Sequence, residues 1–459
     1  MELSIRDIAK VVGATNNWQE WADIRVSAVE FDTRKIEGGA LFVPLQGGTR
    51  DGHEFIQTAV NKGAVLAFWS ESIKELPEDF PVLVVPDTLV AFQQLAKYYL
   101  GTIGPKVIGV TGSNGKTTTK DMIASVLSQQ FVTYKTQGNY NNHIGLPYTI
   151  LHMPAYTEML ILEMGMDHFG EIEVLSQLAT PDVAAITMIG ESHIEFLGSR
   201  QGIAQAKMEI VAGLKPEGLL VVPGDEPLLE SLLESVTAEV IKFGRVETSD
   251  ISGQLVSETK ATTTFTVPSL GEEAVTIPVL GHYNINNALI ALTIGDYFGM
   301  GLAKMARGLE SMNLTASRTE WLTAWNGAEI LSDVYNANPT AMSLVLDTFS
   351  QLPTEGNRLV VLADMGELGE QSAALHKSMA KHIDGAKISS VYLLGQQMAV
   401  LYETLLPIFG PERVLHFKVE DKPELINRLK GEVQPADMLL LKGSNSMKLI
   451  EIVENLLEN

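Results

Sequence analysis

The sequence contains no cysteine among its 459 residues. This absence excludes disulfide bonds, thiolate catalysis and the cysteine ligands of zinc or iron–sulfur centres. Long hydrophobic runs are also missing, since no apolar stretch approaches the ~18 residues that span a membrane. The first twelve residues carry Glu2, Arg6, Asp7 and Lys10 with no apolar core behind them, which is unlike a signal peptide. We therefore expect a soluble, cytoplasmic protein without membrane insertion.

Positive charge is scarce, with 33 Lys and Arg against 56 Asp and Glu and a formal net charge of −23. Such a surface repels nucleic acid and anionic membranes, so we expect no nucleic-acid partner. Phosphate compounds can still bind where backbone N–H groups converge on them. Apolar residues at 45% and charged residues at 19% are typical of a globular protein. The length favours about three domains.

The amino-terminal region, residues 1–103, mixes short strands and helices. It holds apolar strand candidates at 41–43 and 82–85 and helical spacing at 91–100. We expect a linker at 100–105, because Gly101, Gly104 and Pro105 interrupt a helix. This predicts a small α/β domain.

The central and carboxyl-terminal regions, residues 104–314 and 315–459, alternate apolar strands with helical segments. Alternation of this kind predicts parallel sheets with helices on both faces, the second as a doubly wound, Rossmann-like domain. Residues 262–267 suggest an antiparallel excursion, and a helix is expected to begin near Asn284. The fold class is α/β. The strands are expected at 107–110, 159–162, 183–187, 219–222, 329–331, 359–362, 391–394 and 438–441.

The strongest motif is Thr-Gly-Ser-Asn-Gly-Lys-Thr-Thr at residues 111–118, between a short strand and a helix. Its glycines let backbone N–H groups approach phosphate oxygens, and the helix amino terminus adds partial positive charge. Lys116 would reach the β- and γ-phosphates, and the Thr117 hydroxyl would bind Mg²⁺. The strict phosphate-loop pattern fails, because Val110 stands where it requires glycine. The motif predicts a variant nucleotide-binding loop.

With the segments around it, this loop resembles the Mur ligase family, the ATP-dependent amide-bond ligases that build the peptide of bacterial peptidoglycan. The resemblance covers essentially the whole chain and rests on separate motifs in the same order. They lie at residues 32–35, 39–45, 50–56, 136–147, 162–165, 190–199, 206–210, 281–289, 333–340 and 363–369.

For the peptide substrate, the resemblance implies two binding segments. Thr33 and Arg34 would hold the UDP end, and a hydroxyl with a fixed cation suits a diphosphate or a uracil carbonyl. Asn139, Asn141 and Asn142 would hold amide and carboxylate groups of the peptide, because Asn both donates and accepts hydrogen bonds. Turn chemistry is the alternative for these Asn residues.

For the metal, a carboxylate at the end of a parallel strand beside a phosphate loop, as at Glu163, is a common Mg²⁺ position. The resemblance adds His193 as a ligand of a second metal and Lys207 as a lysine that CO₂ converts to an anionic carbamate. A lone His is more often structural, and a solvated helix lysine is the alternative for Lys207. Lys116, Glu163, His193 and Lys207 are thus the implied catalytic residues, with Thr117 as a further metal ligand.

For the nucleotide, Gly112, Ser113, Asn114, Gly115, Lys116, Thr117 and Thr118 would surround the phosphates. By resemblance Asn284 and Asn287 lie near the adenine, with an Asn helix cap as the alternative at this segment. Many members have His where this chain has Tyr283. Arg318, Asp333 and Asn336 would contact the nucleotide from the third domain. The Tyr-Asn-Ala-Asn-Pro run at 335–339 is typical of members that add a dipeptide.

The resemblance thus implies a three-domain ligase: a UDP-muramoyl-binding domain at 1–103, an ATP-binding domain at 104–314 and a Rossmann-like domain at 315–459. It would use ATP and Mg²⁺ to join D-alanyl-D-alanine to UDP-N-acetylmuramoyl-tripeptide through an acyl phosphate. We expect a monomer. The third residue of the tripeptide, L-lysine or diaminopimelate, stays open.

Three alternatives are weighed against this function. A folylpolyglutamate synthase lacks a UDP-binding domain, so the first hundred residues argue against it. A guanine-nucleotide switch would carry Asn-Lys-x-Asp, but Asn61 and Lys62 are followed by Gly63 and Ala64. A pure binding or scaffold module would leave the loop, carboxylate and lysine motifs unexplained.

Overall fold

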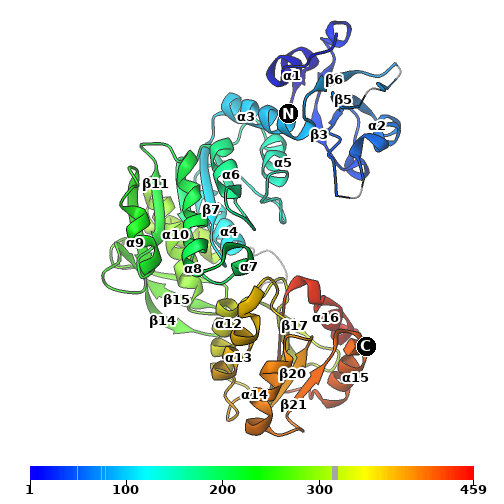
Figure 1. Cartoon of the computed structure of the whole chain (residues 1–459). Helices are drawn as coiled ribbons and strands as arrows, with labels where there is room; N and C mark the ends of the chain where they lie inside the picture. The colour runs from blue at the N-terminus through cyan, green and yellow to red at the C-terminus, as the bar shows by residue number, and fades with distance from the viewer. Residues whose placement is uncertain (49, 74, 78, 313–318, 459) are drawn as a thin grey trace.

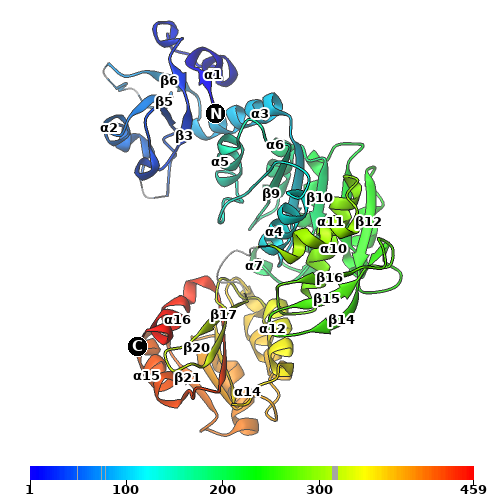
Figure 2. The same cartoon turned by 180° about the vertical axis from the view of Figure 1, so that it is seen from behind.

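The computed structural model describes residues 1–48, 50–73, 75–77, 79–312 and 319–458. The chain forms three lobes that follow one another in an arc, with the amino-terminal lobe and the carboxyl-terminal lobe at opposite ends (Figures 1 and 2). Helix α3 (Thr88–Ile103) runs from the first lobe to the central lobe. No helix in the described part of the chain is long and apolar enough to cross a membrane.

The amino-terminal lobe is built on a four-stranded parallel sheet in the order β3-β4-β5-β6. Apolar residues of α1 and α3 pack in one core, and α2 packs in another around Phe42 and Trp69. A small antiparallel pair, β1 with β2, precedes the sheet. The elements are β1 (Leu3–Ser4), α1 (Ile5–Val12), β2 (Arg25–Val26), β3 (Ala28–Glu30), β4 (Ala40–Phe42), α2 (Ile56–Asn61), β5 (Ala64–Ser70) and β6 (Val82–Val85).

The predicted linker at 100–105 is wrong at its start, because α3 continues through Gly101 to Ile103 and ends at Gly104 in the left-handed conformation. One glycine inside a helix costs only about 1 kcal/mol. The apolar face of α3, which includes buried Phe92 and Leu95, offsets that cost.

The central lobe contains a seven-stranded sheet, entirely parallel, in the order β13-β12-β11-β10-β7-β9-β8. This confirms the predicted parallel sheet. The expected antiparallel excursion is a separate three-stranded sheet of β14, β15 and β16. The strands are β7 (Lys106–Thr111), β8 (Thr133–Lys135), β9 (Met159–Glu163), β10 (Val183–Ile186), β11 (Leu219–Pro223), β12 (Glu239–Gly244), β13 (Ile251–Ser252), β14 (Gln254–Glu258), β15 (Thr263–Thr266) and β16 (Ala274–Ile277).

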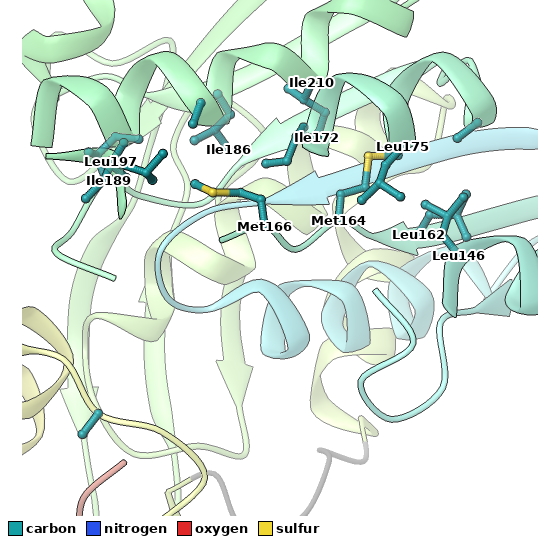
Figure 3. Packing of buried hydrophobic residues seen from close by; sticks show 14 of the residues in the cluster. Leu146, Leu162, Met164, Met166, Ile172, Leu175, Ile186, Ile189, Leu197 and Ile210 are labelled. Atoms are coloured by element: carbon teal, nitrogen blue, oxygen red, sulfur yellow. The ribbon is translucent and has the colours of Figure 1, made fainter. Parts of the chain in front are cut away.

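Helices cover both faces of this sheet, as its uninterrupted apolar strands require. Side chains of α4, α10 and α11 share one core with Ile108 and Val110. On the other face Leu162, Ile172 and Leu175 share a core with Leu146 of α5 (Figure 3), and residues of α8 belong to the same core. The helices are α4 (Lys116–Leu127), α5 (Gly145–His152), α6 (Glu171–Ala179), α7 (Ile194–Leu197), α8 (Arg200–Met208), α9 (Pro227–Leu233), α10 (Asn284–Tyr297) and α11 (Leu302–Glu310).

The carboxyl-terminal lobe has a six-stranded sheet in the order β17-β18-β22-β19-β20-β21, parallel except for β17. Helices α12 and α14 contribute to the core on one face, and α15 and α16 to the core on the other. This confirms a doubly wound unit. The elements are β17 (Glu320–Thr323), β18 (Glu329–Asp333), α12 (Pro339–Gln351), β19 (Arg358–Ala363), α13 (Ser372–Ser378), β20 (Ser390–Leu394), α14 (Ala399–Phe409), β21 (Val414–Phe417), α15 (Lys422–Glu432), β22 (Met438–Lys442) and α16 (Ile450–Leu457).

Candidate active site

The predicted phosphate loop lies between β7 and α4, as the sequence indicates. Gly112 has φ +146° and Gly115 has φ +80°. A Cβ on Gly115 would come within 2.6 Å of Asn287 Oδ1. The loop is tied to the neighbouring strand end, because Thr187 Oγ1 donates to the Asn114 carbonyl at 2.5 Å. At residue 115 glycine is favoured twice over, because the backbone is left-handed and because an added Cβ would push the Asn287 side chain aside.

Lys116 opens α4 and turns back over the loop. Its Nζ donates to the Gly112 carbonyl at 2.9 Å. The loop N–H groups, the helix amino terminus and this ammonium together make a local site for anionic phosphate on a strongly acidic protein.

Glu163, the last residue of β9, is buried beside the loop. Its Oε2 accepts from Thr117 Oγ1 at 2.9 Å, and its Oε1 accepts from Asn141 Nδ2 at 2.9 Å. A hydroxyl and a carboxylate are hard oxygen donors, so this pair fits Mg²⁺. No group of three or more His, Asp or Glu suited to a metal occurs within the described ranges. Mg²⁺ commonly completes its shell with water and substrate phosphates, so the short ligand set is compatible with that ion.

Lys207 lies on α8 and is only 1% exposed, so the solvated-lysine alternative is wrong. Burial holds the pKa of its ammonium well below the ordinary value, and the positive charge of Lys116 lowers it further. Asp167 and Glu209 act in the opposite direction. A lysine with a strongly lowered pKa beside a phosphate loop is a candidate functional residue, whereas a solvated helix lysine would keep its ordinary pKa.

His193 lies where the central and carboxyl-terminal lobes meet. Its backbone is left-handed, with φ +63°. Its Nδ1 is 2.5 Å from Glu367 Oε2 and 3.3 Å from Asp167 Oδ1. The contact with His193 lowers the pKa of the Glu367 carboxyl. Because Nδ1 faces these carboxylates, a role as metal ligand would fall to Nε2.

A cavity of about 730 Å³ lies between the central and carboxyl-terminal lobes. That volume is in the range of small-molecule sites. Most of the residues predicted to bind the nucleotide or the metal line this cavity. Among the predicted residues that the structure describes, Gly112 and Lys207 do not line it. The lining includes Ser113, Asn114, Gly115, Lys116, Thr117, Thr118, Asn141, Glu163, His193, Asn284, Asn287, Asp333 and Asn336.

The two Asn predicted near the adenine are linked to each other. Asn287 Nδ2 donates to Asn284 Oδ1 at 2.9 Å, and Thr119 Oγ1 donates to Asn287 Oδ1 at 3.1 Å. Asn284 is inside α10, and its Nδ2 donates to the Leu280 carbonyl at 2.8 Å. The helix-cap alternative is therefore wrong, since the cap position is Tyr283, whose side chain makes no cap bond. Burial raises the pKa of the Tyr283 phenol, so it stays neutral.

The carboxyl-terminal lobe contributes a buried ion pair that the sequence did not reveal. Lys442, the last residue of β22, places Nζ 2.5 Å from Asp333 Oδ2, and it also donates to the Asn336 carbonyl at 3.0 Å. The available signal was a polar residue at the carboxyl end of a parallel strand, the same signal that marks Glu163. Arg318, predicted to contact the nucleotide with Asp333 and Asn336, lies outside the described residues.

The predicted peptide-substrate residues are not gathered in the cavity, except Asn141. Thr33 and Arg34 lie in the 3₁₀ turn Thr33–Lys35, where Thr33 is half-buried and the exposed Arg34 pairs through Nη2 with Asp32 Oδ2 at 2.7 Å. Asn142 Oδ1 accepts from the N–H of Gly145 at 2.9 Å, as turn chemistry predicts.

Asn139 is exposed to solvent, and its backbone carbonyl accepts a hydrogen bond from the Asn141 N–H at 2.8 Å. Lys35 Nζ donates to the Tyr140 hydroxyl at 2.7 Å. The Asn-rich loop therefore reaches from the amino-terminal lobe to Glu163.

Comparison with known proteins gives consistent matches along the chain. Residues 25–99 match the Mur ligase family catalytic domain, residues 110–295 the Mur ligase middle domain and residues 317–445 the Mur ligase glutamate ligase domain. The chain is 42% identical over 456 residues to UDP-N-acetylmuramoyl-tripeptide–D-alanyl-D-alanine ligase of Bacillus subtilis (strain 168), covering 99% of this chain and 98% of that protein.

Solved structures agree with these matches. A crystal structure of MurF from Acinetobacter baumannii has a TM-score of 0.88 at 28% identity, covering 100% of this chain and 99% of the other. MurF ligase from Thermotoga maritima in complex with ADP has a TM-score of 0.82 at 26% identity, covering 94% and 97%. The sequence similarity extends along the whole chain, three segments match Mur ligase models, and the fold is that of solved MurF structures; the chain belongs to the Mur ligase family.

Proposed function

We propose that this chain is the ATP-dependent ligase that joins D-alanyl-D-alanine to UDP-N-acetylmuramoyl-tripeptide in the cytoplasmic steps of peptidoglycan synthesis. One observation carries the proposal: the phosphate loop faces Asp333 and Asn336 of another lobe across a single cavity. The Bacillus subtilis relative has this activity in its name, and the Thermotoga maritima structure contains ADP. We further propose that the chain acts as a monomer.

For the nucleotide, the phosphates would lie over the loop N–H groups with Lys116 against the β- and γ-phosphates. The adenine would lie near Asn284 and Asn287, which line the same cavity. Asp333 and Asn336 would complete the site from the carboxyl-terminal lobe. Because the two sides belong to different lobes, closure of the lobes would assemble the site and exclude water.

For the peptide substrate, we propose that the region 1–103 holds the UDP end through Thr33 and Arg34. Asn139, Asn141 and Asn142 would hold the peptide as it extends toward Glu163. Support comes from the Lys35–Tyr140 hydrogen bond and from the Asn141–Glu163 hydrogen bond, because through them this loop contacts both the amino-terminal lobe and Glu163 beside the phosphate loop. The regions 104–314 and 315–459 would then be the ATP-binding and Rossmann-like domains.

Thr117 and Glu163 would hold Mg²⁺, with His193 and a carbamylated Lys207 as further ligands. A divalent cation there would reduce the repulsion between the substrate carboxylate and the γ-phosphate. To form the carbamate, the Lys207 amine would bond to the carbon of CO₂ and lose a proton. Burial of Lys207 supports this, because a neutral amine has the lone pair that the reaction needs.

In the reaction, a carboxylate oxygen of the tripeptide attacks the γ-phosphorus, and ADP leaves. The dipeptide amine then attacks the carbonyl carbon, loses a proton, and phosphate departs with formation of the amide. The chain's own residues act by position and charge: Lys116 stabilises charge on the transferring phosphoryl group, and the loop N–H groups fix its oxygens. No side-chain nucleophile is required, in keeping with a sequence that lacks cysteine.

The test is ADP release by the full chain, with each substrate omitted in turn. We expect release only when ATP, Mg²⁺, the UDP-tripeptide and D-alanyl-D-alanine are all present. Running the assay with a panel of UDP-muramoyl peptides identifies the accepted third residue. ADP release that is independent of the dipeptide would refute the ligase and favour a nucleotide switch or a simple ATPase.

A further inference from the structure

The phosphate loop contacts the amino-terminal cap of α12 through a pair of side-chain amides 224 residues apart. Asn338 Nδ2 donates to Asn114 Oδ1 at 2.6 Å, and Asn114 Nδ2 donates to Asn338 Oδ1 at 3.1 Å. The two hydrogen bonds close a ring between the central and carboxyl-terminal lobes, where α12 and α7 approach each other in Figure 1.

Asn338 has no spare hydrogen-bonding capacity. Its Nδ2 also donates to Ser192 Oγ at 2.7 Å, and its Oδ1 also accepts from the Ala341 N–H at 2.9 Å as the cap of α12. An amide has two donor and two acceptor positions, and all four are used in a side chain that is 3% exposed. Turning the amide over would place Nδ2 against the Ala341 N–H, so only one orientation satisfies the site.

The second donor leads back to the same loop. Ser192 Oγ donates to the Ser113 carbonyl at 3.1 Å, and Ser113 Oγ accepts from the Gly190 N–H at 2.9 Å. Asn338 therefore reaches two consecutive loop residues, Asn114 directly and Ser113 through Ser192. A cap alone would need only the Oδ1 atom.

We infer that Asn338 is a positioning residue, which holds the phosphate loop in its phosphate-accepting shape only while the carboxyl-terminal lobe is docked. This inference rests on the proposed ATP site. Linkage makes the coupling reciprocal: if docking of the lobe strengthens nucleotide binding, bound nucleotide strengthens docking by the same factor. The phosphate loop would then have its binding shape only when the carboxyl-terminal lobe is docked and the rest of the active site is in place.

The decisive variant is Asn338→Ser, because serine retains an oxygen for the helix cap but lacks the Nδ2 donors. We expect the Kd of the full chain for both ATP and ADP to rise about tenfold, or about 1.4 kcal/mol. Ser343→Ala is the matched control, since the Ser343 hydroxyl donates only within α12, to the Thr340 carbonyl at 2.9 Å. Its nucleotide Kd should equal that of the wild type.

A double-mutant cycle with Asn114→Ala separates coupling from unrelated damage. If the two amides act as one unit, the nucleotide Kd of the double variant should be no higher than that of the single variant with the higher Kd. Additive losses, or a Kd of Asn338→Ser equal to or below that of the wild type, would overturn the inference while leaving the proposed function intact.

Absence of nucleotide binding in the wild type would overturn both the inference and the proposed function. Should Asn338→Ser fail to fold, Asn338→Thr also retains an oxygen for the helix cap and lacks the Nδ2 donors, without adding charge beside the phosphates. The same tenfold rise in Kd is expected of it, and wild-type affinity would overturn the inference.

Discussion

Gly115→Ala tests two reasons for glycine in the phosphate loop: the left-handed backbone at residue 115 and the lack of room for a Cβ beside Asn287. Alanine in the left-handed conformation of residue 115 costs roughly 1–2 kcal/mol. The new Cβ would lie 2.6 Å from Asn287 Oδ1, so that side chain must move. Its hydrogen bond from Thr119 is worth about 1 kcal/mol. We expect the free energy of unfolding to fall by roughly 2–3 kcal/mol.

The matched control is Gly13→Ala. Gly13 is also left-handed, with φ +63°, but nothing lies within 4 Å of an added Cβ, and it ends α1 in the amino-terminal lobe. This control should show the conformational cost alone and unchanged ATP binding.

Urea unfolding and the Kd for ATP, measured for both variants, make the comparison. For Gly115→Ala we expect the Kd for ATP to rise at least about tenfold, which corresponds to about 1.4 kcal/mol. Wild-type ATP affinity in Gly115→Ala, or an equal loss of affinity in both variants, would refute the reasoning.

Three further variants and one treatment test the rest of the site. Lys116→Ala should lower the ligation rate roughly 10³-fold by removing a phosphate contact, with circular dichroism unchanged; near-wild-type ADP release would contradict the loop assignment. Asn336→Ala should raise the KM for ATP more than that for the dipeptide, and the reverse pattern would place Asn336 at the acceptor site. Lys207→Ala should be nearly inactive, and millimolar acetate should restore part of its kcat by supplying a carboxylate; wild-type kcat would refute a metal-site role. Chelation by EDTA should abolish ADP release and excess Mg²⁺ should restore it, whereas activity in EDTA would contradict the Thr117–Glu163 metal site.

Most of the apolar strands of the central and carboxyl-terminal lobes, and the Gly-rich loop after β7, were predictable because they depend on local sequence. Runs without charged residues, such as 107–110 and 159–162, belong to buried parallel strands. A Gly-rich turn between a strand and a helix is typical of a phosphate-binding loop. Strand β21 was missed because His416 breaks its short apolar run. Strand β12 was missed because Lys242 interrupts its apolar pattern.

The remaining site features depend on contacts between distant residues. The Lys442–Asp333 pair joins residues 109 apart, so neither segment on its own shows that the two charges meet. Burial of Lys207 is invisible locally, because the residue is one charge on a helix whose covered face is set by the tertiary packing. The Asn114–Asn338 pair was likewise hidden, since its two residues lie 224 positions apart in the sequence.

Transfer of a labelled oxygen tests the central claim most directly. The tripeptide carboxylate of the UDP substrate is enriched in ¹⁸O, and the phosphate released during ligation is analysed by mass spectrometry. Because the carboxylate oxygen that attacks the γ-phosphorus departs with phosphate when the amide forms, we predict one ¹⁸O atom in each phosphate released from fully labelled substrate. Phosphate free of ¹⁸O, formed while the amide product accumulates, would contradict the acyl-phosphate route and with it the account of this site.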